Sequence, residues 1–199
     1  MKKAGVRDYE GFVRQVLPLI GEKPISFEVI GDDFETMKRQ ASKLADYGSN
    51  VYVKIPVVNT KGQSTAPLIG ELTAAGVRVN VTAILTLDQV RAVAKVLRAD
   101  VPSVVSVFAG RIADTGIDPV AAMTSAADTL KSNAAAELLW ASSREVLNIY
   151  QAQACGCKII TVTPDILKKM NMIGKDLTEL SLETVQMFFN DAVSSGLGL

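Results

Sequence analysis

A single lysine within a β-strand pattern is the residue of this sequence best suited to covalent chemistry. Lys54 lies in Asn50–Pro56, a run of strand-forming residues that ends in proline. Alternation places it opposite the valines and the isoleucine of the run, and the apolar flanks predict a strand buried on both faces. Burial favours the neutral amine, which can attack a carbonyl to form a Schiff base. In the alternative interpretation, Lys54 lies on an edge strand and extends its ammonium to water.

Other polar side chains stand within or just after the expected strands: Thr82, Arg111, Ser142, Arg144 and Thr163. Barrels of alternating strands and helices carry their chemistry at these strand ends. The sequence contains no histidine, which excludes Ser-His-Asp, Cys-His and histidine–metal mechanisms. Acid–base chemistry must therefore come from carboxylates, lysine, tyrosine or water. Cys155 and Cys157 are too close for a favourable disulfide, and we expect small buried residues beside a helix end.

Strand and helix patterns alternate along the chain. Strands are predicted at 25–30, 50–56, 77–85, 104–109, 138–142 and 159–162. Helices are predicted at 9–17 (closed by Pro18), 34–47 (capped by Asp32 or Asp33), 64–75, 86–98, 119–131, 144–153, 165–170 and 182–193, with a polar loop at 111–118. The alternation predicts an α/β fold with a parallel sheet, either doubly wound or closed as a (β/α)8 barrel. The absence of Gly-x-Gly-x-x-Gly after the first strand weakens the dinucleotide-binding version.

Composition narrows the class of partner. The net charge is zero and no basic block occurs, so no nucleic-acid partner is expected. No apolar run reaches about 18 residues, so no membrane span is expected. No apolar signal segment follows the first basic residues, which makes a cytoplasmic location the default. We expect a single domain over residues 1–199.

Six short segments resemble the transaldolase family in its short form, which includes fructose-6-phosphate aldolase. In chain order they are Ser26–Val29, Val53–Pro56, Asn80–Ala83, Ser106–Ile112, Ala141–Arg144 and Thr161–Pro164. Each match alone is weak, whereas six in the family's order extend over essentially the whole chain. The resemblance implies a (β/α)8 barrel of the TIM type, of which this chain presents six of the eight strands.

The resemblance also implies an activity. That activity is the transfer of a dihydroxyacetone unit between sugar phosphates in the pentose phosphate pathway, through a Schiff base on Lys54 and with no metal or organic cofactor. Glu28 and Thr82 would complete the catalytic set, with Thr82 positioning a water. The implied substrate-binding residues are Ser106, Phe108, Arg111, Ser142 and Arg144.

Two positions favour transaldolase over the aldolase branch. Glu28 and Phe108 stand where the aldolases carry glutamine and tyrosine. The arginines suit bidentate binding of a sugar phosphate. Each residue also has a plain structural alternative. The arginines could form surface ion pairs, Glu28 could pair with Lys54 without excluding catalysis, and the hydroxyls of Thr82, Ser106 and Ser142 could satisfy backbone groups.

The sequence departs from the family at its start. The family's strands with Leu-Asp-Thr and Thr-Thr-Asn-Pro are absent, and with them the expected acid–base aspartate and a substrate-contacting asparagine. We favour a misplaced start, with roughly 30 further residues, about one βα unit of a typical barrel. The same departure would result if a partner subunit completed the barrel, or if the chain were a non-catalytic derivative. The functional alternatives are a fructose-6-phosphate aldolase-like enzyme or a non-catalytic phosphosugar-binding protein.

The predicted C-terminal helix is unusually apolar. It carries Leu182, Val185, Met187, Phe188 and Phe189, more apolar surface than a free terminal helix tolerates. It packs either on its own barrel or on a neighbouring subunit, and the resemblance implies the second, in rings of five or ten. We predict a homo-oligomer larger than a dimer.

Overall fold

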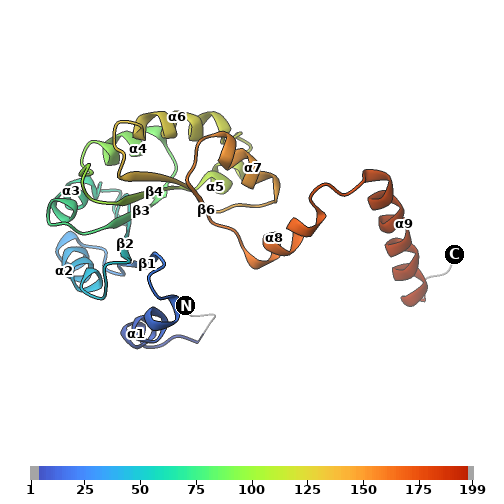
Figure 1. The fold of residues 1–199 in the computed structure, drawn as a ribbon, viewed down its shortest axis with the longest axis horizontal. Coiled ribbons are helices and arrows are strands. Elements are labelled where there is room, and N and C mark those ends of the chain that lie inside the picture. Colours follow the sequence, from blue (N-terminus) through green and yellow to red (C-terminus); the bar gives the residue numbers. More distant parts are fainter. Residues whose placement is uncertain (1–4, 197–199) are drawn as a thin grey trace. The chain divides into compact units, whose positions relative to one another are not determined.

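The computed structural model describes residues 5–196 (Figure 1). The chain divides into two compact units, 1–162 and 163–199. The β-sheet belongs to the first unit, and the last helices belong to the second. A single domain over the whole chain, as the sequence predicts, stays a prediction.

Six parallel strands form the sheet in the order in which they occur along the chain. They are β1 (Ile25–Glu28), β2 (Val51–Pro56), β3 (Val79–Ile84), β4 (Ser103–Val107), β5 (Ala136–Trp140) and β6 (Ile159–Ile160). Sequential order without a reversal is the arrangement of a barrel wall, whereas a doubly wound sheet reverses at a switch point. The sheet curls into a half-barrel (Figure 1), which confirms the predicted α/β class and the six strands of a (β/α)8 barrel.

Helices connect the strands, as parallel pairing requires. In the first unit they are α1 (Tyr9–Ile20), α2 (Phe34–Ala45), α3 (Ala66–Ala74), α4 (Leu87–Ala94), α5 (Ala109–Ala113), α6 (Val120–Leu130) and α7 (Leu147–Ala154). The side chains of Asp8, Asp33 and Thr86 cap α1, α2 and α4 by accepting backbone N–H groups of the first turn. In Figure 1, α2, α3, α4 and α6 lie along the convex side of the sheet.

The main core fills the space between the sheet and these helices. It is built from the outward-facing strand residues and the facing side chains of the helices, and its fully buried members include Met37, Val53, Ile55, Ile69, Val81 and Trp140. A smaller apolar cluster around Val104, Leu139 and Ala141 forms separately. Alternation along the strands assigns it to the concave face. The register aligns Lys54 with Asn80 and Asn80 with Val104, so Lys54 shares that concave face.

The helices differ from the predictions at several places, two of which are Pro18 and Arg111. The first helix continues through Pro18 to Ile20, although Pro18 has no N–H to donate to the carbonyl of residue 14. Gly21, at φ 62°, then ends the helix. Arg111 lies in α5 rather than in a loop, since the Phe108 carbonyl accepts the N–H groups of residues 111 and 112.

The segment after β5 also differs. The sequence predicts a helix from Arg144, but α7 begins at Leu147. The side-chain oxygen of Asn148 accepts the N–H groups of Arg144 and Glu145, at 2.7 and 3.2 Å. These two amides are therefore held by a side chain that follows them in the sequence, and they lie outside the helix.

Side chains cover the outer edge of β1. The Tyr9 hydroxyl donates to the Glu28 carbonyl at 3.0 Å. The Gln40 side-chain oxygen accepts the N–H groups of Ile30 and Gly31, both at 2.8 Å. Tyr9 belongs to α1 and Gln40 to α2, so each helix satisfies backbone groups that a further strand would otherwise pair.

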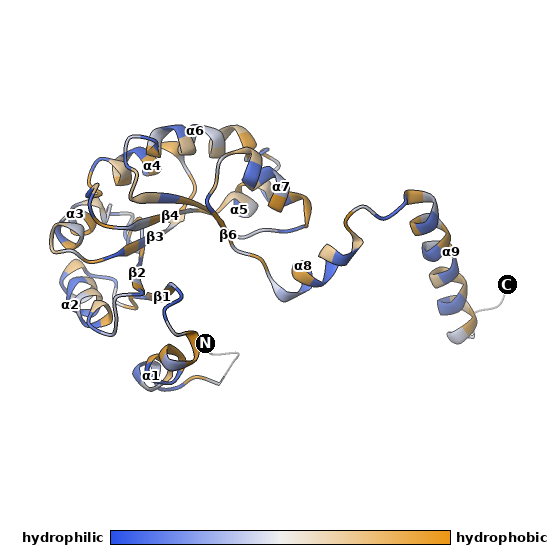
Figure 2. Cartoon of the chain, viewed as in Figure 1, coloured by the Kyte–Doolittle hydropathy of each residue, from blue (hydrophilic) through white to orange (hydrophobic). Residues whose placement is uncertain are grey.

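The second unit contains α8 (Pro164–Lys169), a 3-10 turn, η2 (Met170–Met172), and α9 (Leu177–Ser194). The last helix begins earlier than the predicted residue 182, because Asp176 caps it by accepting two backbone N–H groups. No residue of α9 is buried, and hydrophobic and hydrophilic residues alternate along it in Figure 2. Within residues 5–196, no helix is long and apolar enough to cross a membrane.

Candidate active site

A cavity of about 380 Å³ opens where the strands end. Its lining comes from neighbouring strands and the segments that follow them: Ser26, Lys54, Asn80, Thr82, Ser106, Phe108, Leu139, Ala141, Ser142 and Thr161. Carboxyl ends of parallel strands are the usual place for catalytic groups in barrels of this kind. Five of the eight residues predicted from the sequence line it: Lys54, Thr82, Ser106, Phe108 and Ser142.

Lys54 pairs with a carboxylate of the adjacent strand. The register places Glu28 of β1 beside Lys54 of β2, and Lys54 Nζ lies 3.3 Å from Glu28 Oε2. The predicted burial of β2 on both faces is wrong, because the Lys54 side chain is 32% exposed and that of Glu28 is 44% exposed. The convex face of β2 is covered by helices, whereas its concave face belongs to an open half-barrel.

A hydrogen-bonded chain runs beside Lys54. Ser106 Oγ donates to Asn80 Oδ1 at 2.7 Å, and Asn80 Nδ2 donates to Ser26 Oγ at 2.9 Å. Asn80 is the register partner of Lys54 on β3, so this chain fixes the amide next to the amine. Ser26 and Asn80 lie in segments that resemble the family, but the sequence alone assigns them no role. One feature of the sequence could have pointed to Asn80: it is a polar residue two positions before Thr82, on the same face of a valine-rich strand.

Thr82 is buried with its hydroxyl unpaired. The residue is 2% exposed, and Thr82 Oγ1 has no hydrogen-bond partner within residues 5–196. A buried polar atom in that state marks a place for a water or a ligand group. Next to it, Ala83 has φ 59° and the pairing of β3 with β4 shifts register between Val81 and Ile84. This bulge re-aims the end of β3 at the cavity.

The two predicted phosphate-binding arginines stand beside the cavity residues but do not line the cavity. The Arg111 guanidinium lies 5.0 Å from the ring centroid of Phe108. Arg144 forms two hydrogen bonds to Asp114, one from Nε to Oδ1 at 3.0 Å and one from Nη2 to Oδ2. The hydrogen bond from Arg144 holds the pKa of the Asp114 carboxyl below its usual value, and the positive charge of Arg111 acts in the same direction.

Gly110 brings the two arginine segments together. A Cβ atom added to Gly110 would lie 1.6 Å from the Ser142 carbonyl oxygen, so α5 contacts the backbone after β5 without room for a side chain. Ser142 itself has φ 66°, and its N–H donates to Thr161 Oγ1 at 3.2 Å. Backbone strain of this kind persists where surrounding contacts fix it. Gly110 is therefore a site-building residue that the sequence alone does not single out.

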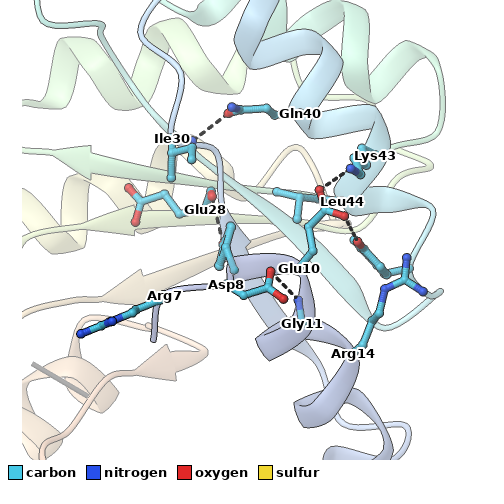
Figure 3. Close-up of a pocket in the computed structure, with 12 residues that line it drawn as sticks. Arg7, Asp8, Glu10, Gly11, Arg14, Glu28, Ile30, Gln40, Lys43 and Leu44 are labelled. Carbon is cyan, nitrogen blue, oxygen red and sulfur yellow. Dashed lines mark hydrogen bonds and ion pairs between the residues drawn. The ribbon is translucent and has the colours of Figure 1, made fainter. Parts of the chain in front are cut away.

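A second cavity, of about 490 Å³, lies on the other side of Glu28, between α1 and α2 (Figure 3). Its charged side chains largely satisfy one another, since Lys43 pairs with Glu10 and Arg14 stacks on Tyr47. In Figure 3 the Glu28 carboxylate points away from Lys43. Glu28 thus contributes its carboxylate to Lys54 and its backbone carbonyl to Tyr9.

The cysteines stand apart from this chemistry. Cys155 is buried at the end of α7 and Cys157 is half-buried, and both are free thiols. Burial raises the pKa of the Cys157 thiol to about 12, with a further contribution from Cys155. A thiol in that state supplies almost no thiolate near neutral pH, so it is a poor nucleophile.

Comparison with known proteins shows the family of this chain. A family model for transaldolase/fructose-6-phosphate aldolase matches residues 9–197. A probable transaldolase of Thermoanaerobacter sp. (strain X514) is 32% identical over 178 residues, which is 89% of this chain and 77% of the relative. Probable transaldolases of Nitrosopumilus maritimus (strain SCM1) and Methanococcus maripaludis (strain C7 / ATCC BAA-1331) are 31% and 30% identical. The matched segments span 80% and 92% of this chain, and 68% and 80% of the two relatives, respectively. The chain belongs to the transaldolase/fructose-6-phosphate aldolase family.

Proposed function

We propose that this chain is a transaldolase that transfers a dihydroxyacetone unit between sugar phosphates of the pentose phosphate pathway through a Schiff base on Lys54. The contact that carries the proposal is Lys54 Nζ at 3.3 Å from Glu28 Oε2, at the edge of the cavity. An amine with a carboxylate partner at a strand end has a nearby acceptor for the proton that it must lose before attacking a carbonyl.

The reaction needs no redox partner. Neutral Lys54 Nζ adds to the C2 carbonyl of the ketose phosphate, and loss of the C2 oxygen as water gives a protonated imine. Cleavage of the C3–C4 bond leaves its electron pair on the imine as an enamine, while the C4 hydroxyl proton passes to a base and an aldose phosphate departs. The enamine then adds to a second aldose phosphate, and hydrolysis of the new imine releases the product ketose and restores Lys54.

Glu28 and Thr82 have separable roles in this scheme. Glu28 accepts the proton of the Lys54 ammonium and exchanges protons with water in the cavity. The unpaired Thr82 hydroxyl holds the water that is lost and regained at the imine carbon. Asn80, held by Ser26 and Ser106, presents its amide beside the same carbon.

The remaining residues bind the sugar and its phosphate. Ser106 and Ser142 offer hydroxyls to the sugar, and Phe108 closes one side of the cavity. Arg111 and Arg144 bind the phosphate, for which planar guanidinium groups are suited. Glu28 and Phe108 support transaldolase over fructose-6-phosphate aldolase, because the residues that distinguish the aldolase branch are glutamine and tyrosine.

Reductive trapping tests the proposal. We expect borohydride with fructose 6-phosphate to attach a sugar-derived mass to Lys54 irreversibly, as read by peptide mass spectrometry. A Lys54→Met chain treated in parallel is the control and should stay unlabelled. Labelling at another lysine, or binding of fructose 6-phosphate without labelling, would reject the Schiff base. Production of fructose 6-phosphate from free dihydroxyacetone and glyceraldehyde 3-phosphate would favour the aldolase branch over transfer.

We propose further that α9 joins copies of this chain into a homo-oligomer larger than a dimer. Leu182, Val185, Phe189 and Val193 recur at helical spacing and are 59 to 67% exposed. A continuous apolar stripe on one face of a helix is suited to packing against a protein surface. The stripe gives one patch that a complementary surface of the next copy could receive around a ring.

We expect a Val185→Asp/Phe189→Asp chain to form smaller species in solution than the unaltered chain, because charges on the stripe oppose apolar contact. Met187→Asp is the matched control, since Met187 is 50% exposed and lies on the opposite side of the helix by its spacing. Light scattering measures both. An unaltered chain that is monomeric, or a double variant with unchanged mass, would contradict the proposed assembly.

A further inference from the structure

The contact between Asp114 and Arg144 is more constrained than an ordinary surface ion pair. Arg144 donates two parallel hydrogen bonds to the two carboxylate oxygens of Asp114, the geometry that fixes the plane of a guanidinium. The main-chain N–H of Arg144 is also held, by Asn148 Oδ1 at 2.7 Å. The arginine is therefore fixed at both its backbone and its tip.

Asp114 is itself fixed by the short helix that precedes it. Its N–H donates to the Gly110 carbonyl at 3.0 Å, and Gly110 touches the backbone of Ser142. Asp114 thus links α5 to the segment after β5 at two points, through the Gly110 contact and through Arg144. The carboxylate has a defined position relative to Ser142, which lines the cavity.

The guanidinium keeps donors for a ligand. Of its five N–H groups, the fork to Asp114 uses one at Nε and one at Nη2, so three have no hydrogen-bond partner within residues 5–196. A phosphate could accept hydrogen bonds from these three N–H groups while Asp114 still binds the opposite edge of the Arg144 guanidinium. Arg111 lies one turn before Asp114 in α5, and its charge also acts on the Asp114 carboxyl. The carboxylate of Asp114 is therefore within the electrostatic influence of both Arg111 and Arg144.

We propose that Asp114 is a positioning residue that orients the guanidinium of Arg144 toward the phosphate of the substrate and so sets the preference for phosphorylated sugars. The inference rests on the proposed function, because it takes the cavity as the sugar-phosphate site. Asp114 does not touch the reacting carbon and acts only through Arg144. The pair is about half exposed, at 46% for Arg144 and 52% for Asp114, so its removal should change stability little.

The test compares a phosphorylated with an unphosphorylated ketone. In wild type and Asp114→Asn, borohydride trapping at Lys54 is titrated with fructose 6-phosphate and with dihydroxyacetone. We expect the fructose 6-phosphate concentration for half-maximal labelling to rise about tenfold in Asp114→Asn, the size of one misaligned charge-assisted hydrogen bond. The dihydroxyacetone titration should not move, and Asp114→Glu should recover part of the loss. Asp128→Asn, which alters a carboxylate paired with Lys131 elsewhere, should match wild type.

Two results would overturn the inference. An unchanged or tighter fructose 6-phosphate titration in Asp114→Asn would mean that the carboxylate does not orient Arg144 for phosphate. Parallel losses for both ketones, with a lowered melting temperature, would mean that the residue only supports the fold. If wild type is labelled by neither ketone, the proposed function fails. In that case, calorimetry measures the affinity of both chains for inorganic phosphate. Weaker phosphate binding by Asp114→Asn than by wild type would support the positioning role, and equal binding would reject it.

Discussion

Replacing Lys54 with methionine is expected to lower turnover at least about a thousandfold, the scale seen when a covalent nucleophile is removed. Methionine has a similar length but no amine, so the imine cannot form. Transfer from fructose 6-phosphate to erythrose 4-phosphate, followed by the appearance of the aldose product, measures the loss. The ion pair with Glu28 is also lost, but Lys54 is partly exposed, and such pairs contribute little to stability.

Lys61→Met is the matched control for this substitution. Lys61 lies in the loop after β2 and is exposed, so we expect its variant to retain turnover. Circular dichroism and thermal melting should be alike for both variants. If Lys54→Met kept more than a few per cent of the activity of a chain that transfers dihydroxyacetone, the covalent mechanism would have to be abandoned.

Replacing Gly110 with alanine is expected to destabilise the first unit by about 3 kcal/mol, the upper part of the usual range for overpacking. The new Cβ would lie 1.6 Å from the Ser142 carbonyl oxygen and 2.7 Å from its carbon. Both atoms are backbone, so relief requires movement of α5 or of the strand end, not of a flexible side chain. The melting temperature should fall by roughly 6–12 °C for a chain of this size.

The same substitution should weaken binding of phosphorylated sugars, because α5 carries Arg111 and positions Asp114 against Arg144. Gly70→Ala is the control. Gly70 lies in α3, and the nearest atom to its added Cβ would be the Val96 Cβ, at 3.4 Å, so we expect a change within about 1 kcal/mol. A Gly110→Ala chain as stable as wild type would mean that α5 does not contact the Ser142 backbone as described.

The alternation of strands and helices could be predicted because it depends on local spacing. In β2, valines and isoleucine alternate with Tyr52 and Lys54, and the structure buries the first set. The closeness of Lys54 and Glu28 follows from the pairing of consecutive strands. The register that aligns the two residues cannot be predicted from the sequence of either strand alone. The exposure of Lys54 could not be predicted, because the apolar residues around it in the sequence pack on the convex face of the sheet. They carry little information about what covers the concave face.

Other features depend on contacts between distant segments. Asp114 and Arg144 are 30 residues apart, and no periodicity relates them. The φ of 59° at Ala83 is not a conformation that alanine favours, so the bulge of β3 has no residue-type signal. The need for glycine at position 110 arises from the carbonyl of Ser142, on a different strand connection. By contrast, the cap at Asp176 could have been read from the Asp-Leu-Thr-Glu pattern.

The bonds along β1 have a consequence for behaviour at high protein concentration. In parallel pairing, Val29 N–H points toward β2, where it reaches the Lys54 carbonyl, so the Glu28 carbonyl and the Ile30 N–H point outward. Tyr9 and Gln40 occupy these two groups. A strand from another molecule therefore finds them already bonded and would have to displace both side chains to extend the sheet there. The β1 border is thereby guarded against the edge-to-edge growth that leads to β-aggregates.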